Sequence, residues 1–306
     1  MPLSPYGGFR LSGKQGNNVF AYDERKRTDL DPKLRVPSLK EISSIDDIEL
    51  DDQPVFAELD DAGNVVTYTW LKHLYLLPPR THPNPSPLVR EGRGEIPYPP
   101  WEGGQGGLKK QRSKIIVIDN HNHALYFRTK HILNNLTPSP SPMRRGEGAG
   151  GDGVRCIHID QYSDLAKPPL SLQEYANECN YSSDIFCKRS ASSDLFSSYT
   201  THTCNVGNFI QPALQAGLIS EYIWLRNQYY LDSLTAHIPP LVKGGEGRFI
   251  LDIDLDFRAP EMDTDLATSK PLLIDLLHNA SLVTIATSPY FLDQQHAIDL
   301  LHQLFT

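Results

Sequence analysis

The stretch RFILDIDLDF, from Arg248 to Phe257, joins a short apolar run to three aspartates at alternate positions. Phe249, Ile250 and Leu251 follow one another without a polar residue between them, a pattern typical of a strand that is buried on both faces. The segment Arg248 to Asp254 is therefore predicted to be a buried strand that ends among carboxylates.

Similar apolar runs recur on both sides of this strand, and helical patterns separate them. Alternation of strand and helix implies right-handed crossovers and a parallel sheet covered by helices. The sequence therefore predicts an α/β fold with three layers, a parallel sheet with helices on both faces. The predicted strands are 114–119, 155–160, 220–225, 248–254 and 281–287, and the predicted helices are 123–135, 208–217 with a left-handed cap at Gly217, 271–279 and 292–305.

The chain divides by composition into an N-terminal segment, 1–107, and a core, 108–306. Within the first, PVFAELDDAGNVVTYTWLKHLYLL predicts two strands around the turn 61–64, and the sequence leaves open whether they pack on the sheet or form a small subdomain. Three stretches rich in Pro, Gly, Ser and charge cannot bury enough apolar area to offset the entropy of ordering. We expect disordered loop insertions at about 81–107, 136–153 and 238–247.

Composition excludes several classes of protein. A net charge of -8 over 306 residues argues against nucleic-acid binding, which needs a clustered basic face. The sequence contains no run of about 18 apolar residues, so no membrane span is predicted. The first residues have no apolar signal region, so a cytoplasmic location is expected. The four cysteines lack the paired spacing of a zinc site, and we expect small buried thiols at Cys156, Cys179, Cys187 and Cys204.

Ionisable residues gather where three predicted strands end. In a parallel sheet these carboxyl ends meet at one edge, where ligands bind. Converging carboxylates repel one another unless they are protonated or neutralised, and a pair of divalent cations achieves this. Ligands that are mostly carboxylate with one or two imidazoles favour Mn²⁺ or Mg²⁺ over structural Zn²⁺, and favour Mn²⁺ where a histidine takes part. The three segments are Asp119 to His123, Asp160 to Asp164 and Asp252 to Asp256.

Five motifs in fixed order carry a resemblance to a known family. They are VIDNHNHALYF, CIHIDQYSDL, NVGNFIQPALQAGLISEYIWL, ILDIDLDF and VTIATSPYFLDQ. Together they resemble the uncharacterised arginase-related family that includes the peptide arginases, over most of the chain from about Ile115. The resemblance implies a ureohydrolase (arginase/deacetylase-like) fold and a binuclear Mn²⁺ centre. It also implies a substrate, an arginine-containing ribosomally made precursor peptide, whose arginine side chains are hydrolysed to ornithine with release of urea.

The resemblance also assigns metal ligands. His121 matches the histidine that binds the first metal, and Asp160 and Asp164 match the outer carboxylates of the family's Asp-x-His-x-Asp segment. Asp252 and Asp254 match the Asp-x-Asp pair on the later strand. By this similarity Asp160 and Asp252 would bridge the two metals, Asp164 would complete the first site and Asp254 the second.

One position departs from the family pattern. Tyr162 stands where the family has the histidine that binds the second metal, and a phenol is a poorer ligand at neutral pH than an imidazole. Tyr162 is therefore a metal-ligand candidate that weakens the second site, and His123 or His158 could supply the imidazole instead. His158 is more readily explained as a core or hydrogen-bonded histidine.

The mechanism implied is metal-assisted hydrolysis at the guanidinium carbon. Asp254 is the candidate proton shuttle, and His123 is the second candidate catalytic residue. The segment 287–290 (TSPY) stands where arginases carry an acidic residue that holds the guanidinium, so a different way of gripping the substrate is expected.

Two other functions remain open. The first is amide hydrolysis as in the arginase-like deacetylases, which use one metal held by Asp, His and Asp, so that Tyr162 counts against it. The second is a catalytically impaired, metal-stabilised protein that binds a peptide without turning it over.

Overall fold

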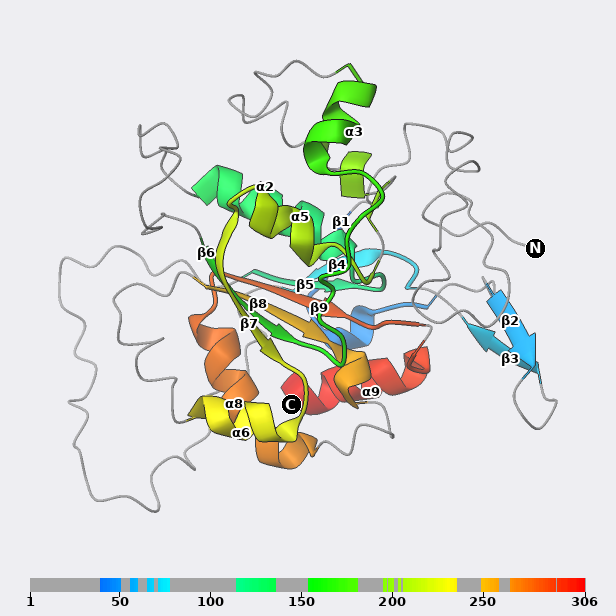
Figure 1. Cartoon of the computed structure of the whole chain (residues 1–306). Helices are drawn as coiled ribbons and strands as arrows, with labels where there is room; N and C mark the ends of the chain where they lie inside the picture. Colours follow the sequence, from blue (N-terminus) through cyan, green and yellow to red (C-terminus); the bar gives the residue numbers. More distant parts are fainter. Residues whose placement is uncertain are drawn as a thin grey trace, which may run out of the picture.

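The structure of the protein is a computed structural model, in which the larger described segments form one sheet with helices on both faces (Figure 1). The expected loop insertions, the turn at 61–64, Tyr290 and Cys187 lie outside the described residues. These residues are 39–50, 56–59, 65–68, 71–77, 114–135, 154–180, 195–196, 198–200, 203–204, 206–235, 249–258, 265–289 and 291–305.

The main sheet has seven strands in the order β1-β4-β5-β9-β8-β6-β7. Five of them are the strands predicted from the apolar runs, each within two residues of its expected bounds. β5, β9, β8, β6 and β7 all pair in parallel. Their carboxyl ends therefore share one edge of the sheet. The strand bounds are β1 Leu39–Glu41, β4 Leu74–Leu77, β5 Lys114–Ile118, β6 Val154–Ile159, β7 Ile219–Leu225, β8 Phe249–Asp254 and β9 Leu282–Ala286.

Helices cover both faces of this sheet, which confirms an α/β arrangement compatible with three layers (Figure 1). One face carries α2 (His123–Asn135), α3 (Leu172–Glu178) and α5 (Ile210–Gln215). The other face carries α6 (Gln228–Thr235), α8 (Leu266–Asn279) and α9 (Gln294–Phe305).

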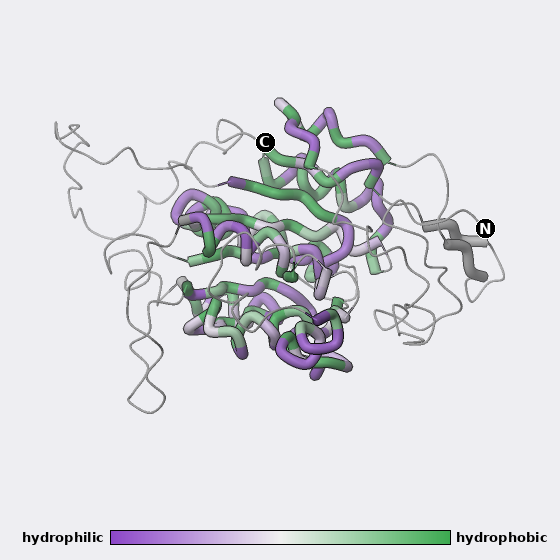
Figure 2. The backbone as a smooth tube through the Cα atoms, turned by 90° about the horizontal axis from the view of Figure 1, so that it is seen from above, coloured by the Kyte–Doolittle hydropathy of each residue, from purple (hydrophilic) through white to green (hydrophobic). Residues whose placement is uncertain are grey.

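Apolar residues explain why the strands lie inside. All six residues of β8 and all five of β9 are buried, and long stretches of the central strands are coloured as hydrophobic in Figure 2. Because successive side chains of a strand point to opposite faces, the strands contribute residues to two separate apolar clusters, one on each face of the sheet. The aspartates of β8 are buried as well, and their charges need partners within the fold.

The helix ends follow ordinary capping chemistry. Ser171 and Glu174 form a reciprocal capping box at the start of α3. After α5 the chain turns at Gly217 with φ of 68°, which confirms the predicted left-handed position. Cys156 and Cys204 are buried as expected. Cys179 is exposed, contrary to expectation, because it is the C-cap residue of α3 and lies outside the core.

The N-terminal strands divide between two sheets. β2 (Phe56–Leu59) and β3 (Val65–Tyr68) pair antiparallel, which confirms the predicted hairpin strands. β4 instead pairs antiparallel with β5, and β1 pairs in parallel with β4. The expected boundary at residue 107 therefore does not separate the strands of the main sheet, because segment 39–77 supplies two of them.

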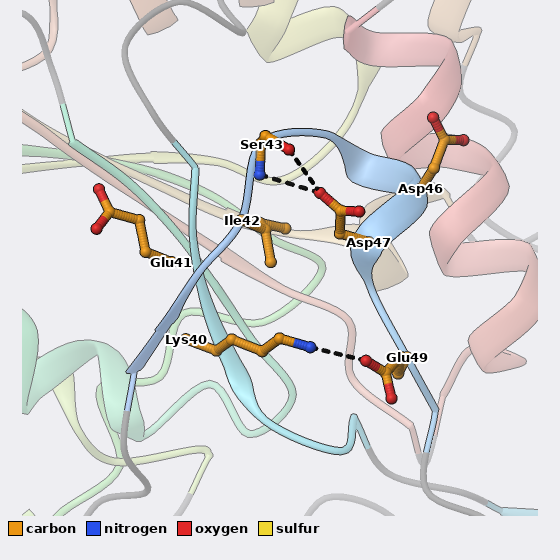
Figure 3. A pocket seen from close by; sticks show the side chains of 7 residues that line it. All are labelled: Lys40, Glu41, Ile42, Ser43, Asp46, Asp47 and Glu49. Carbon is orange, nitrogen blue, oxygen red and sulfur yellow. Dashed lines mark hydrogen bonds and ion pairs between the residues drawn. The ribbon is translucent and has the colours of Figure 1, made fainter.

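A short 3-10 helix, η2 (Ile45–Asp47), follows β1. The carboxylate of Asp47 accepts hydrogen bonds from the backbone N–H and the hydroxyl of Ser43, both at 3.0 Å, and Lys40 Nζ donates to Glu49 at 2.7 Å (Figure 3). These residues line an open pocket that contains none of the clustered histidines and aspartates described below. None of the described helices is both long enough and apolar enough to cross a lipid bilayer.

Candidate metal centre

The site is built on the turns that follow β6 and β8. In each turn the aspartate at the end of the strand accepts, through one oxygen, a hydrogen bond from the backbone N–H of the residue two positions later. Asp160 Oδ1 accepts from Tyr162 at 2.7 Å, and Asp254 Oδ1 accepts from Asp256 at 3.0 Å. Such short-range bonds are the usual reason that aspartate occupies tight turns. They leave the Oδ2 atom of each carboxylate directed at the common edge of the sheet.

His121 lies among these carboxylates, just beyond β5, and is 1% exposed. Three Oδ2 atoms surround its Nδ1, and none of the three contacts has hydrogen-bond geometry. The oxygens belong to Asp254 at 3.0 Å, Asp160 at 3.1 Å and Asp164 at 3.4 Å. A ring nitrogen that faces three carboxylate oxygens in this way is arranged as a metal ligand is.

Two aromatic side chains of β7 hold the loop that carries Asp164. Tyr222 and Trp224 on β7 donate from their side chains to the carbonyl oxygens of Ser163 at 2.6 Å and Asp160 at 2.9 Å. Asp164 itself has a φ of 51°, a left-handed value that costs free energy for any residue with a Cβ. Backbone strain of this kind is found at functional sites, where the surrounding structure enforces it.

Asp256 is the most poorly satisfied acid of the group. Its side chain is fully buried, and neither carboxylate oxygen accepts a hydrogen bond of ordinary geometry from the described residues. It lies in the 3-10 helix η6 (Leu255–Arg258), which continues directly from β8. The backbone N–H of Gln161 lies near enough to lower the pKa of Asp256, but a buried carboxylate with so few donors is costly, which makes it a candidate ligand for a cation.

Two groups of potential ligands share Asp160. The first contains His121, Asp160 and Asp164, and the second contains Asp160, Asp254 and Asp256, with the ligand atoms of each group within 4.8 Å of one another. The described residues could therefore hold metal ions in two adjacent positions. The first group matches the residues that the resemblance assigns to the first metal.

Asp252 has a different environment from the other aspartates. Its Oδ2 is hydrogen-bonded to His121 Nε2 at 2.8 Å and His158 Nδ1 at 2.7 Å, and forms an ion pair with Arg128. Its Oδ1 accepts a hydrogen bond from the hydroxyl of Thr284. His121, His158 and Asp252 also lie close enough to form a third group of potential ligands, but protein donors already surround this carboxylate.

The pKa values divide these acids into two kinds. Burial and the charge of Asp160 raise the pKa of Asp164 well above its usual range, and burial and the charge of Asp254 do the same for Asp256. Burial also raises the pKa of Asp252, but Arg128 and His121 outweigh it and hold that pKa well below the usual range. The surroundings therefore disfavour the charged forms of Asp164 and Asp256 and favour that of Asp252.

The pKa values of His121 and His123 are shifted in opposite directions. Burial lowers the pKa of His121, but the charges of Asp252 and Asp254 outweigh burial and hold it well above 6.5. Burial alone lowers the pKa of His123 to about 3. His123 is buried at the start of α2, with Nδ1 3.9 Å from Asp119, and belongs to none of the ligand groups.

The structure does not bring the Tyr162 side chain into the cluster. The residue is 44% exposed, and its ring packs against Phe291 with ring centroids 5.9 Å apart. Its backbone contributes instead, because the carbonyl oxygen lies 3.1 Å from His158 Nε2. His158 is buried and hydrogen-bonded, which confirms the prediction of a hydrogen-bonded histidine. Its ring stacks on that of His121.

Three members of the site were not singled out from the sequence. Asp256 was visible as the third aspartate of the alternating run, but nothing local separates it from Asp252. Arg128 on α2 could have been noticed as a charged residue within an otherwise apolar helix face. Ser288, which has a φ of 43° and donates to Asp254 Oδ2 at 2.5 Å, lies in the segment that lacks the acidic residue of arginases.

Comparison with known protein families, curated proteins and solved structures finds no match to this chain.

Proposed function

We propose that the protein is a metal-dependent hydrolase that converts arginine side chains of a peptide to ornithine and urea. The observation that carries the metal centre is the carboxylate of Asp256, which is fully buried, has no ordinary hydrogen-bond partner among the described residues, and lies beside Asp160 and Asp254. The choice of arginine as substrate rests on the five motifs that resemble the peptide arginases.

The charges of the cluster support two ions rather than one. Asp160, Asp164, Asp254 and Asp256 carry four negative charges when ionised, and two divalent cations balance them. Asp252 does not enter this balance, because the Arg128 guanidinium already pairs with it. His121 would hold the first ion with Asp160 and Asp164, and Asp254 and Asp256 would hold the second, with Asp160 shared. Carboxylates with one imidazole suit Mn²⁺.

The chain's own residues can serve this reaction. When bound, a pair of divalent cations supplies Lewis acidity and lowers the pKa of a bound water. Asp254 is the residue proposed to carry a proton to the departing ornithine amine, because burial raises its pKa and one oxygen is held by Ser288.

The test is urea release from an arginine-containing peptide by the full chain loaded with Mn²⁺, with the metal content measured in parallel. Ornithine in the peptide is confirmed by mass spectrometry. The matched control is Asp256→Asn, which keeps the shape of the side chain and removes the charge. We expect urea from the wild type and little from the variant.

Other outcomes separate the remaining functions. Acetate release from an acetyl-lysine peptide without urea would favour the amide hydrolase. Metal binding with tight peptide binding but no product would favour the non-catalytic protein. A wild-type chain that retains no divalent ion after loading and desalting would contradict the metal centre itself.

A further inference from the structure

Asp252 is the aspartate that the family pattern makes a bridging ligand, yet its surroundings argue for another role. A carboxylate offers about four acceptor positions. Two histidine nitrogens and one threonine hydroxyl are hydrogen-bonded to Asp252, and the Arg128 guanidinium forms an ion pair with it without hydrogen-bond geometry. A carboxylate that bridges two metals through both oxygens needs a lone pair on each, and the two histidine nitrogens already take both acceptor positions of Oδ2.

Arg128 holds Asp252 in this arrangement. Its side chain is 1% exposed, it forms an ion pair with Asp252, and its guanidinium lies over the ring of Phe209 at 5.1 Å. A buried guanidinium requires a buried anion, since either charge alone would be strongly destabilising. The guanidinium therefore ties Asp252 to α2 and keeps it ionised.

The consequence falls on His121. An ionised carboxylate can only accept, so the 2.8 Å contact means that His121 donates its Nε2–H to Asp252. The other ring nitrogen, Nδ1, faces Asp160, Asp164 and Asp254 at 3.0 to 3.4 Å, and it offers a lone pair to a cation once the ring gives up the proton that these carboxylates favour. Metal-binding histidines are commonly fixed in this way by a carboxylate on the second nitrogen.

We propose that Asp252, anchored by Arg128, is a positioning residue that orients His121 for metal binding and is not itself a metal ligand. The proposal rests on the metal centre proposed above and departs from the ligand set that the resemblance implies. Asp254 and Asp256, rather than Asp252 and Asp254, are then the metal-binding pair of the β8 end.

A matched pair of double variants tests this role. R128M/D252N and R128M/D252L both remove the buried ion pair, a change that proteins often tolerate when both partners go. Only the first keeps an oxygen that can accept from His121 Nε2. The readouts are the number of Mn²⁺ ions per chain, the Mn²⁺ affinity by calorimetry, and the absorption spectrum of the Co²⁺-loaded protein, which reports nitrogen ligation.

We expect both variants to bind the wild-type number of ions. R128M/D252N should keep an affinity within a few-fold of the wild type, whereas R128M/D252L should bind about 10 to 100-fold more weakly and change the Co²⁺ spectrum. Loss of one ion per chain in both variants would make Asp252 a ligand and overturn the proposal. Equal, wild-type affinity in both would overturn it too.

Two further measurements keep the outcomes distinct. A wild type that binds no metal refutes the metal centre and this proposal together, whereas a metal-binding wild type with one ion lost in both variants refutes only the role of Asp252. If the double variants do not fold, Thr284→Val removes the donor to Asp252 Oδ1 with little change of shape. We then expect a several-fold weaker affinity at unchanged stoichiometry, and an unchanged or tighter affinity would contradict the proposal.

Discussion

Asp256→Asn separates the cost of an empty acidic cluster from the benefit of a bound cation. The wild-type carboxylate is fully buried, and burial with the charge of Asp254 raises its pKa well above the ordinary value of about 3.9. Each unit of that rise destabilises the metal-free fold by about 1.4 kcal/mol once the pH exceeds the folded-state pKa. Asparagine has nearly the same shape and no charge to bury.

The sign of the effect follows from linkage. A carboxyl group whose pKa is raised on folding stabilises the fold at low pH and loses this contribution as the pH rises from the unfolded-state pKa to the folded-state pKa. Without metal, the stability of Asp256→Asn relative to the wild type should therefore increase between pH 5 and pH 8. With Mn²⁺ at about 100 times its dissociation constant, the wild type should gain about 2.7 kcal/mol, or about 5 to 10 °C in Tm, and the variant clearly less.

The assay is thermal unfolding of both proteins from pH 5 to pH 8, with EDTA and with Mn²⁺. Asp299→Asn is the control, because Asp299 is an exposed residue on α9 outside the cluster, and it should shift neither series. Equal stabilisation of Asp256→Asn and wild type by Mn²⁺ would refute Asp256 as a ligand. A stability difference that does not change with pH would refute the cost assigned to its burial.

Three other outcomes are expected. Mn²⁺ affinity should rise with pH because Asp164, Asp256 and His121, whose pKa values are all raised, must release protons, and calorimetry in buffers of different ionisation enthalpy would show the proton release, whose absence would contradict the raised pKa values. Tyr162→His should not add a metal ion, since the side chain is 44% exposed and packs on Phe291, and an extra equivalent in elemental analysis would contradict that position. Gly217→Ala should lower the free energy of unfolding by about 1 to 2 kcal/mol, because its φ of 68° disfavours a Cβ, and an unchanged denaturation midpoint would argue against the turn.

Much of the fold could be predicted because its signals are local. The five parallel strands are apolar runs, and the helix after β5 was predicted at the bounds observed, His123–Asn135. α3 was missed although its capping box, Ser171 to Glu174, is visible in the sequence. The antiparallel attachment of β4 to β5 could not be predicted, because strand direction depends on which element the chain meets in three dimensions.

The site shows the same division between local and tertiary information. Clustering of His121, Asp160 and Asp164 follows from strand ends that meet at one edge, and the structure brings these residues together. The different roles of Asp252 and Asp256 do not follow from the sequence, because both are alternate aspartates of one run. What separates them is Arg128, which reaches Asp252 from a helix far away in the chain.

The position of β9 has a consequence for how the protein is made. β9 is the last strand in the chain, but it lies inside the sheet between β5 and β8. A nascent chain released up to α8 therefore has a gap at the centre of its sheet, with an unpaired edge on both sides, rather than a finished core that lacks only a border. His121 beyond β5 and the aspartates of the β8 end gain their fixed spacing when β9 fills that gap. Alignment of these candidate ligands is then a late step of folding, because it waits for a strand that follows all the others of the sheet.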